Sequence, residues 1–180
     1  SGLQGKGRMQ EPEDIVSFME NHISKNLPLQ GKKVVLTAGP TYEAIDPVRF
    51  IGNNSSGKMG FELAKRAAAL GAEVILISGP SALDVDHANI TILRVNTADE
   101  MFEVSKLHFT DADIFIASAA VSDFKPDTNA TQKIKKETGF SQINLTPTPD
   151  ILAHLGTIKE KQFLVGFALE TENELENAHS

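Results

Sequence analysis

The residues best suited to bind an anion lie between Thr37 and Gly60. There an apolar segment, residues 32–37, leads into a polar loop, and Gly57 and Lys58 open a segment with helical periodicity. The free N–H groups of a first helical turn and the helix dipole both favour a negative charge. This order predicts a cradle for phosphate groups at the start of the helix, formed by Gly39, Ser55, Ser56, Gly57 and Lys58.

Two common phosphate-binding motifs do not fit this stretch. Residues 52–59 contain G-x-x-x-x-G-K, but Met59 stands where a P-loop needs a Ser or Thr hydroxyl for magnesium, and a thioether cannot replace it. About a dozen residues also separate the apolar segment from these glycines, whereas a P-loop follows its strand directly. The G-x-G-x-x-G fingerprint of dinucleotide-binding folds is missing too. We therefore interpret the loop as another type of phosphate site.

The rest of the chain alternates between segments of strand length and segments of helical periodicity. Strands are predicted at residues 32–37, 73–78, 90–95, 114–118 and 163–168, and helices at 58–70, 98–109 and 150–156. Strands joined through helices require right-handed crossovers and parallel pairing. The predicted fold class is α/β, a three-layer Rossmann-like, mostly parallel sheet with helices on both faces.

Local signals mark where these helices begin, end and pack. Gly71 is the predicted end of the first helix, and Thr97 and Glu100 form a capping box for the second. Thr148 is the expected cap of the third, before Pro149 in its first turn. The residues of the first helix that are expected to face inward are Phe61, Leu63, Ala64, Ala67 and Ala68.

Ligands of such folds bind at the carboxyl ends of the strands, near a topological switch point. The polar loops of this chain all follow predicted strands. We therefore expect Asn53, Asp123, Phe167 and the lysine cluster at 133–136 to lie in one neighbourhood.

Residues 1–30 differ from the rest and are interpreted as a tail and linker, separate from a domain at 31–180. Pro12 is predicted to start a helix there, with acidic residues around its positive end. Its apolar stripe consists of Ile15, Phe18, Met19, His22 and Ile23.

The composition argues against several classes of protein. A 180-residue chain that is 41% hydrophobic can form one well-packed domain, and its net charge of −7 argues against nucleic-acid and membrane-surface binding. Without cysteine it can form no disulfide and no thiolate nucleophile, and its five histidines lack metal-binding spacing. No apolar run approaches the roughly 18 residues of a membrane span, and no signal peptide is present at the start, so we expect a cytoplasmic location.

The motifs resemble the phosphopantothenoylcysteine synthetase family. T-A-G-P-T at 37–41 and D-P-V-R-F-I-G-N-N-S-S-G-K-M-G at 46–60 carry the resemblance. Later stretches match in the same order: A-A-V-S-D-F at 119–124, K-I-K-K at 133–136, P-D-I at 149–151 and V-G-F-A-L-E-T at 165–171. In bacteria this domain is the C-terminal half of a bifunctional coenzyme A biosynthesis flavoprotein, and residues 1–30 resemble the end of its decarboxylase half.

The resemblance implies a phosphopantothenate–cysteine ligase. CTP would activate the carboxylate of 4′-phosphopantothenate as an acyl-cytidylate with release of pyrophosphate, and the amine of L-cysteine would then displace CMP. Mg²⁺ is implied with CTP, FMN only in the separate decarboxylase domain, and a homodimer in the complete protein. The family continues beyond its last motif in this sequence, so we expect the domain at 31–180 to be C-terminally incomplete.

The resemblance also implies roles for individual residues. Asn53 and Lys133 would be catalytic, Arg49 would bind the substrate phosphate and reach a neighbouring subunit, and Asp123 would bind the nucleotide or a metal. Asn53 and Ala120 would join the phosphate and substrate site. The implied nucleotide-binding set is Ala117, Ser118, Ala119, Asp123, Lys133, Pro149, Asp150, Ile151, Leu152 and Phe167. Plainer interpretations are a turn for Asn53, a solvated charge run for Lys133 and core packing for Phe167.

Two other functions stay open from the residues alone. One is an NAD(P)-dependent reductase on the same fold, although Tyr42, the single tyrosine, has no lysine four residues later to form a Tyr-x-x-x-Lys pair. The other is a non-catalytic nucleotide-binding domain, because its loops would have the same sequence pattern as those of an enzyme.

Overall fold

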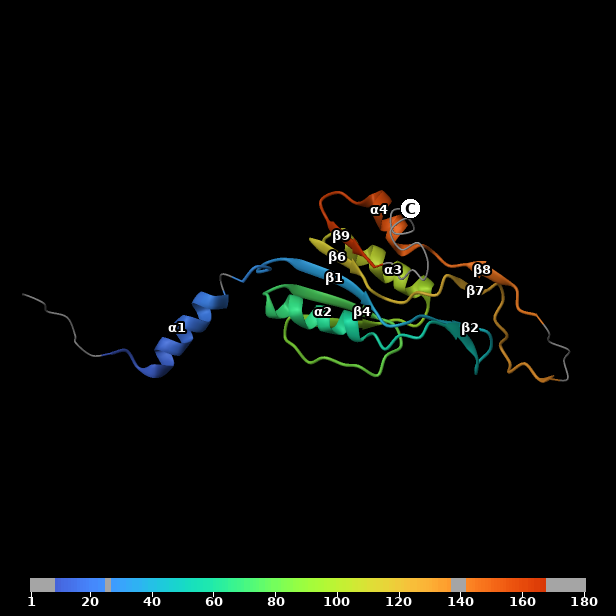
Figure 1. Ribbon diagram of the computed structural model, residues 1–180, viewed down its shortest axis with the longest axis horizontal. Helices are drawn as coiled ribbons and strands as arrows, with labels where there is room; N and C mark the ends of the chain where they lie inside the picture. Colours follow the sequence, from blue (N-terminus) through green and yellow to red (C-terminus); the bar gives the residue numbers. More distant parts are fainter. Residues whose placement is uncertain (1–8, 25–26, 137–141, 168–180) are drawn as a thin grey trace, which may run out of the picture.

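A five-stranded parallel sheet forms the centre of the computed structural model, which describes residues 9–24, 27–136 and 142–167 (Figure 1). The strand order is β5-β4-β1-β6-β9, and the central strand β1 pairs with β4 on one side and with β6 on the other. The strands are β1 (Lys33–Ala38), β4 (Glu73–Ser78), β5 (Ile90–Arg94), β6 (Ile114–Ala117) and β9 (Phe163–Gly166). The five predicted strands are confirmed to within two residues at each end. The predicted extension of the last one to Ala168 lies outside the described residues.

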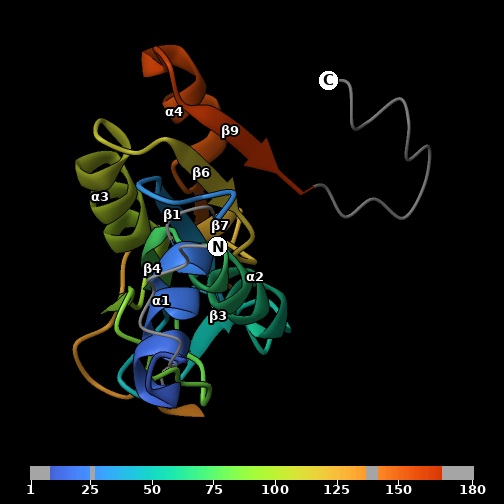
Figure 2. The ribbon, with the colours of Figure 1, turned by 90° about the vertical axis from the view of Figure 1, so that its left-hand side faces the viewer.

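Helices cover both faces of the sheet, which confirms the three-layer prediction. Helix α2 (Lys58–Ala69) packs on one face, where Phe61 meets Val34 and Leu36 of β1. Helices α3 (Ala98–Phe109) and α4 (Ile151–Ile158) pack on the other face around Val35 and Phe115. Neighbouring residues of a strand point to opposite faces, so β1 supplies side chains to both cores. Figure 2 shows α2 and α3 on opposite sides of the strands.

The helix ends follow the predicted signals in two cases and differ in the third. Thr97 and Glu100 form the complete capping box of α3, and Gly71, with φ +96°, follows the end of α2. Of the residues predicted to face inward on α2, Leu63 is partly buried and the others are buried. The cap of α4 is Asp150, whose side chain accepts from Ala153 N at 2.8 Å, so the prediction of Thr148 was wrong.

Two small antiparallel sheets interrupt what we expected to be polar loops. One pairs β2 (Tyr42–Ala44) with β3 (Phe50–Gly52), and the other pairs β7 (Phe124–Pro126) with β8 (Leu145–Pro147). Strands of three residues are too short to show the alternation from which strands are predicted. Glu43 of β2 is buried and accepts a hydrogen bond from Ala98 N at 2.8 Å, which ties the first small sheet to the start of α3.

Helix α1 (Pro12–Ser24) begins at the predicted proline but does not bury its apolar stripe. Phe18 is 70% exposed and Ile23 is 59% exposed. Figure 1 shows this helix clear of the central sheet. In the part of the chain that the structure describes, no helix has both the length and the apolar character needed to span a membrane.

Candidate functional site

A cavity of about 250 Å³ opens at the carboxyl ends of β1 and β6. From β1 the chain continues to β4 and β5 on one side, and later strands β6 and β9 extend the sheet on the other. The cavity therefore lies at the topological switch point, where open α/β sheets bind their ligands. Its lining residues are Thr37, Ala117, Ala119, Val121, Asp123, Thr148, Pro149, Asp150, Ile151, Leu152 and Phe167.

Two threonines shape the wall that follows β6. Thr37 Oγ1 accepts from the backbone N–H groups of Ser118 and Ala119, at 3.2 and 3.1 Å, and Ser118 Oγ donates to Thr37 O at 2.5 Å. Thr41 Oγ1 accepts from Ser122 N at 2.9 Å. Both threonines are buried, and a buried hydroxyl needs a partner, so these bonds fix the loop after β6 against the loop after β1. Our sequence reasoning missed both, although polar residues at the end of a buried strand were the available signal.

The opposite wall consists of the start of α4 and the end of β9. Thr148 Oγ1 donates to Ser122 O at 2.5 Å, and Thr148 N donates to Asp123 O at 2.9 Å. These bonds join the entrance of α4 to the loop after β6. Phe167 lines the cavity and is 54% exposed, so it does not belong to the core.

The predicted phosphate cradle lies at the start of α2. Gly57 has φ +78°, a left-handed conformation, and a Cβ there would lie 3.1 Å from Gly39 N. Glycine at this position thus satisfies both the backbone angle and the close approach of the two loops. Ser55 Oγ accepts from Gly57 N and Ser56 Oγ accepts from Lys58 N, each at 3.3 Å.

The first turn of α2 adjoins the cavity wall. A Cβ on Gly60 would lie 2.9 Å from Ser118 Oγ and 2.5 Å from Ala38 Cβ, so this helix can approach the loop after β6 only with glycine here. The backbone of Ala120 also donates to Gly39 O at 2.8 Å. The predicted cradle is therefore packed directly against the loop after β6, which lines the cavity.

Asn53 connects the segment after β3 to this surface. Its Nδ2 donates to Val121 O at 2.9 Å and is 3.4 Å from Ala120 O. Because Val121 lines the cavity, the structure brings Asn53 to the predicted neighbourhood. The side chain is exposed to solvent.

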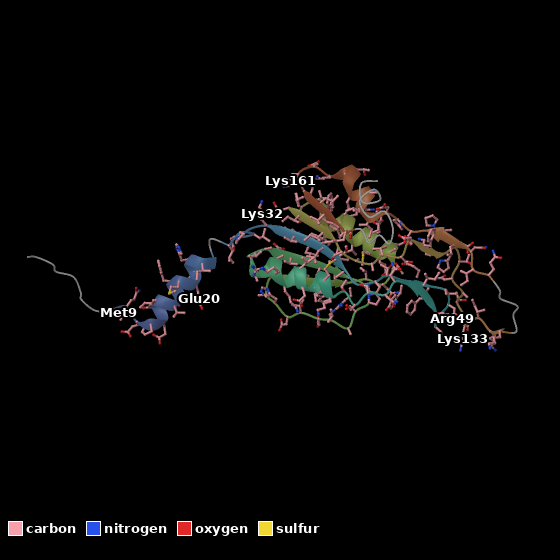
Figure 3. All side chains as sticks on the ribbon, in the orientation of Figure 1. Met9, Glu20, Lys32, Arg49, Lys133 and Lys161 are labelled. Atoms are coloured by element: carbon pink, nitrogen blue, oxygen red, sulfur yellow. The ribbon has the colours of Figure 1, made fainter. Side chains whose placement is uncertain are left out.

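Arg49 and Lys133 lie elsewhere, beside each other at the end of the molecule opposite Met9 (Figure 3). Arg49 forms an ion pair with Asp46, and its Nη2 donates to Ile134 O at 2.9 Å. Neither residue lines the cavity of its own chain. The expectation that the lysine cluster lies beside Phe167 was therefore wrong. The reason is the small sheet of β7 and β8, which carries the intervening chain away from the edge of the main sheet.

The donor groups at the cavity bear on metal binding. Among the described residues, no three His, Asp or Glu side chains gather closely enough to hold a metal ion. Asp123 supplies a single exposed carboxylate to the cavity. One carboxylate suits Mg²⁺ that arrives with a nucleotide, since Mg²⁺ commonly binds through one or two carboxylates plus substrate phosphates.

The carboxylate of Asp46 is the most strongly perturbed acidic group of the described residues. Its side chain is completely buried, and the hydrogen bond from the Arg49 guanidinium holds the pKa of this carboxyl well below its usual range. Burial opposes this effect, and the N–H groups of Val48, Ile134 and Arg49 add to it. In the unfolded chain the pKa of an aspartate is about 3.9. Ionised Asp46 therefore stabilises the fold above that pH, and the contribution is lost as the pH falls toward the lower folded-state pKa.

We expect Asp46→Asn to lower the free energy of unfolding at pH 7. The difference from the unaltered chain should shrink as the pH falls from about 5 to 2. Urea unfolding across this range measures the difference. Asp86→Asn is the control, because Asp86 is exposed and no hydrogen bond of its side chain is among those described. A difference for Asp46→Asn that stays constant with pH would contradict the assignment.

The chain is similar in sequence to a described protein family and to several known proteins. A family model, the DNA/pantothenate metabolism flavoprotein C-terminal domain, matches residues 29–180. The chain is 52% identical to a cysteine/cysteine sulfinic acid decarboxylase from an unknown prokaryotic organism, covering 100% of this chain and 52% of that protein. It is 49% identical to the coenzyme A biosynthesis bifunctional protein CoaBC of Bacillus subtilis (strain 168), covering 96% of this chain and 43% of that protein. The chain thus spans about half the length of these curated relatives.

Two solved structures share the fold. The C-terminal domain of a coenzyme A biosynthesis bifunctional protein CoaBC is 45% identical, with a TM-score of 0.74, covering 86% of this chain and 72% of that one. A mutant of Cab2 in complex with phosphopantothenate-cysteine is 21% identical, with a TM-score of 0.63, covering 91% of this chain and 71% of that one.

Proposed function

This chain belongs to the family of the DNA/pantothenate metabolism flavoprotein C-terminal domain, and from that membership we propose that it is a phosphopantothenate–cysteine ligase. The observation that carries the proposal is the cavity at the switch point, which adjoins the predicted phosphate cradle at the start of α2. The CoaBC names of its relatives support this assignment, and so does the phosphopantothenate-cysteine held by the Cab2 mutant.

The proposed reaction has two steps. A carboxylate oxygen of 4′-phosphopantothenate attacks the α-phosphorus of CTP, and the bond to pyrophosphate breaks to leave an acyl-cytidylate. The amine of L-cysteine then attacks the acyl carbon, CMP departs, and the amine proton is released. Such a site needs positive charge along the triphosphate and donors for the oxygens that gain charge, but no protein nucleophile.

The cavity suits the nucleotide. The N–H groups of Ser118 and Ala119 are engaged by Thr37 Oγ1, so we expect the cytosine to meet carbonyl oxygens and small side chains along this wall. The exposed ring of Phe167 can stack on the base. The start of α4, capped by the Asp150 side chain, closes the same cavity beside the base.

The charged parts of the substrates would lie toward α2. Asp123 would provide one oxygen ligand for Mg²⁺ bound to the triphosphate, which neutralises the developing charge on the phosphates. Asn53 would donate a neutral N–H to the acyl phosphate, since its Nδ2 already lies at the cavity wall. The positive end of α2 and the exposed Lys58 side chain would attract the remaining anionic groups.

The position of Arg49 and Lys133 supports a homodimer. Both lie away from the cavity of their own chain, so they would serve the cavity of a partner. Arg49 and Lys133 lie in the connections within the two small sheets, and these sheets with their connections expose apolar side chains, with Val48 at 61%, Phe50 at 51%, Phe124 at 51% and Leu145 at 48%. Exposed apolar patches mark association surfaces, and a two-fold axis would place each site opposite its partner's arginine. The predicted tail and linker at residues 1–30 would lie outside this unit except at its end, where Leu29 packs against the core beside α2 and donates to Leu70 O at 2.9 Å.

We expect CTP with Mg²⁺ to raise the Tm of the chain well above the rise caused by ATP or NADPH. A ligand at about a hundred times its dissociation constant stabilises a protein by roughly 2.7 kcal/mol, an effect that thermal unfolding resolves easily. Ala119→Leu, which places a larger side chain in the cavity, should remove this rise. Ala88→Leu, exposed at the opposite end of the sheet, should retain it.

Other outcomes would contradict the proposal. A larger rise with NADPH would favour a reductase, and binding of CTP without release of pyrophosphate in the presence of both substrates would favour a non-catalytic domain. Release of carbon dioxide from cysteine in the absence of CTP would favour the activity named for the 52% identical relative.

A further inference from the structure

Asp46 lies in the turn between β2 and β3 and collects hydrogen bonds from distant parts of the chain. Its Oδ1 accepts from Val48 N and Arg49 N, each at 2.9 Å. Its Oδ2 accepts from Arg49 Nε at 3.0 Å, from Arg49 Nη2 and from Ile134 N at 3.1 Å. Ile134 is 88 residues away in sequence, so this carboxylate joins two separate segments.

The segment that carries Lys133 is bonded to this turn at two points. Ile134 is held through both backbone groups, because its N–H donates to Asp46 and its carbonyl accepts from Arg49 Nη2 at 2.9 Å. Ala130 N donates to Ile45 O at 2.9 Å. Lys133 stands between these points, directly before Ile134, and its side chain is exposed (Figure 3).

We propose that Asp46 is the positioning residue of Lys133. Together with Arg49 it anchors the backbone of Ile134, and this anchor determines the position of the neighbouring Lys133 backbone from which the lysine side chain extends. The inference rests on the proposed function, in which Lys133 acts at the nucleotide phosphates. Asp46 itself is buried and does not line the cavity. A lysine side chain has several rotatable bonds, so an anchored backbone limits the volume that its ammonium group can search.

The bonding pattern requires a carboxylate. Both oxygens of Asp46 accept, and every group around them is a donor. Asparagine has the same shape but presents one acceptor and one donor. Its NH₂ group would therefore face either the N–H groups of the turn or those of Arg49 and Ile134, and one set would lose its acceptor.

The anchor can be tested without any enzymatic assay. We expect Asp46→Asn to raise the hydrogen-exchange rate of the Ile134 amide by at least about tenfold more than it raises the rates of the β1 amides, which report the global loss of stability. Asp127→Asn is the matched control, because this exposed aspartate lies near the same segment and its side chain accepts from the Thr128 hydroxyl at 3.3 Å. Unchanged exchange at Ile134 in folded Asp46→Asn would overturn the anchor.

A double-mutant cycle on ligase turnover tests the consequence. We expect Asp46→Asn to lower kcat by about tenfold and to leave the KM for cysteine unchanged. The variant that combines it with Lys133→Gln should lose less than the two single losses added as free energies, because one part of the Asp46→Asn loss acts through Lys133 and only the part that acts through Arg49 adds to it. If the two losses in kcat are fully additive, Asp46 does not act through Lys133, because a merely structural defect lowers kcat independently of the lysine. If the unaltered chain shows no turnover, the proposed function fails, and the exchange rate of Ile134 still decides the anchor.

Discussion

Replacing Asn53 with aspartate is expected to lower the turnover of cysteine ligation by at least about a hundredfold without unfolding the protein. Asn53 Nδ2 donates to Val121 O at the cavity wall, and its amide can offer a neutral N–H to an oxygen that gains negative charge. Aspartate has the same shape but no donor. It would place a negative charge against the Val121 carbonyl and against the anionic acyl phosphate.

Asn54→Asp is the matched control for this experiment. Asn54 is the next residue along the chain, it is also exposed, and no hydrogen bond of its side chain is among those described. Release of pyrophosphate reports the first step, and formation of the cysteine amide reports both. Full turnover by Asn53→Asp, or an equal loss in both variants, would show that Asn53 is not part of the catalytic machinery. The Tm of each variant shows whether it is folded.

The largest effect on stability is expected at Gly79, which follows β4. A Cβ at this position would lie 1.7 Å from Pro40 O and 2.8 Å from the Pro40 carbonyl carbon, both backbone atoms. Rotation of a side chain cannot relieve this overlap, so the loops after β1 and β4 would have to separate. We expect Gly79→Ala to cost at least about 3 kcal/mol of the free energy of unfolding, at the upper end of overpacking effects.

Gly156→Ala provides a direct comparison. Gly156 lies in α4, and a Cβ there would meet no atom within 4 Å. Alanine is the better helix former, so this variant should be neutral or more stable by up to about 1 kcal/mol. Urea unfolding measures both variants. Because the loop at Gly79 also packs against Gly39 of the phosphate cradle, any Gly79→Ala protein that folds should show a smaller rise in Tm with CTP. Equal stability of the two variants would contradict the close approach of these loops.

Much of the candidate site could be predicted from the order of its motifs. The small residues after β6, the start of α4 and Phe167 were each expected at the nucleotide, and the structure places them around one cavity. Parallel strands end at the same edge of a sheet, so their order along the chain was enough to bring these loops together. The same reasoning failed for Lys133, because β7 and β8 lead the chain away from that edge.

The sequence by itself determined the main sheet, the three helices that cover it and the glycine-rich start of α2. These depend on local periodicity and on caps such as Thr97 with Glu100, which lie within a few residues of one another. Only the tertiary structure decided which distant groups satisfy the buried polar side chains. Thr37 bonds to a backbone 81 residues away, Glu43 to one 55 residues away and Asp46 to one 88 residues away. A buried polar group must find a partner, but only the folded chain determines which one, because the partner comes from another part of the sequence.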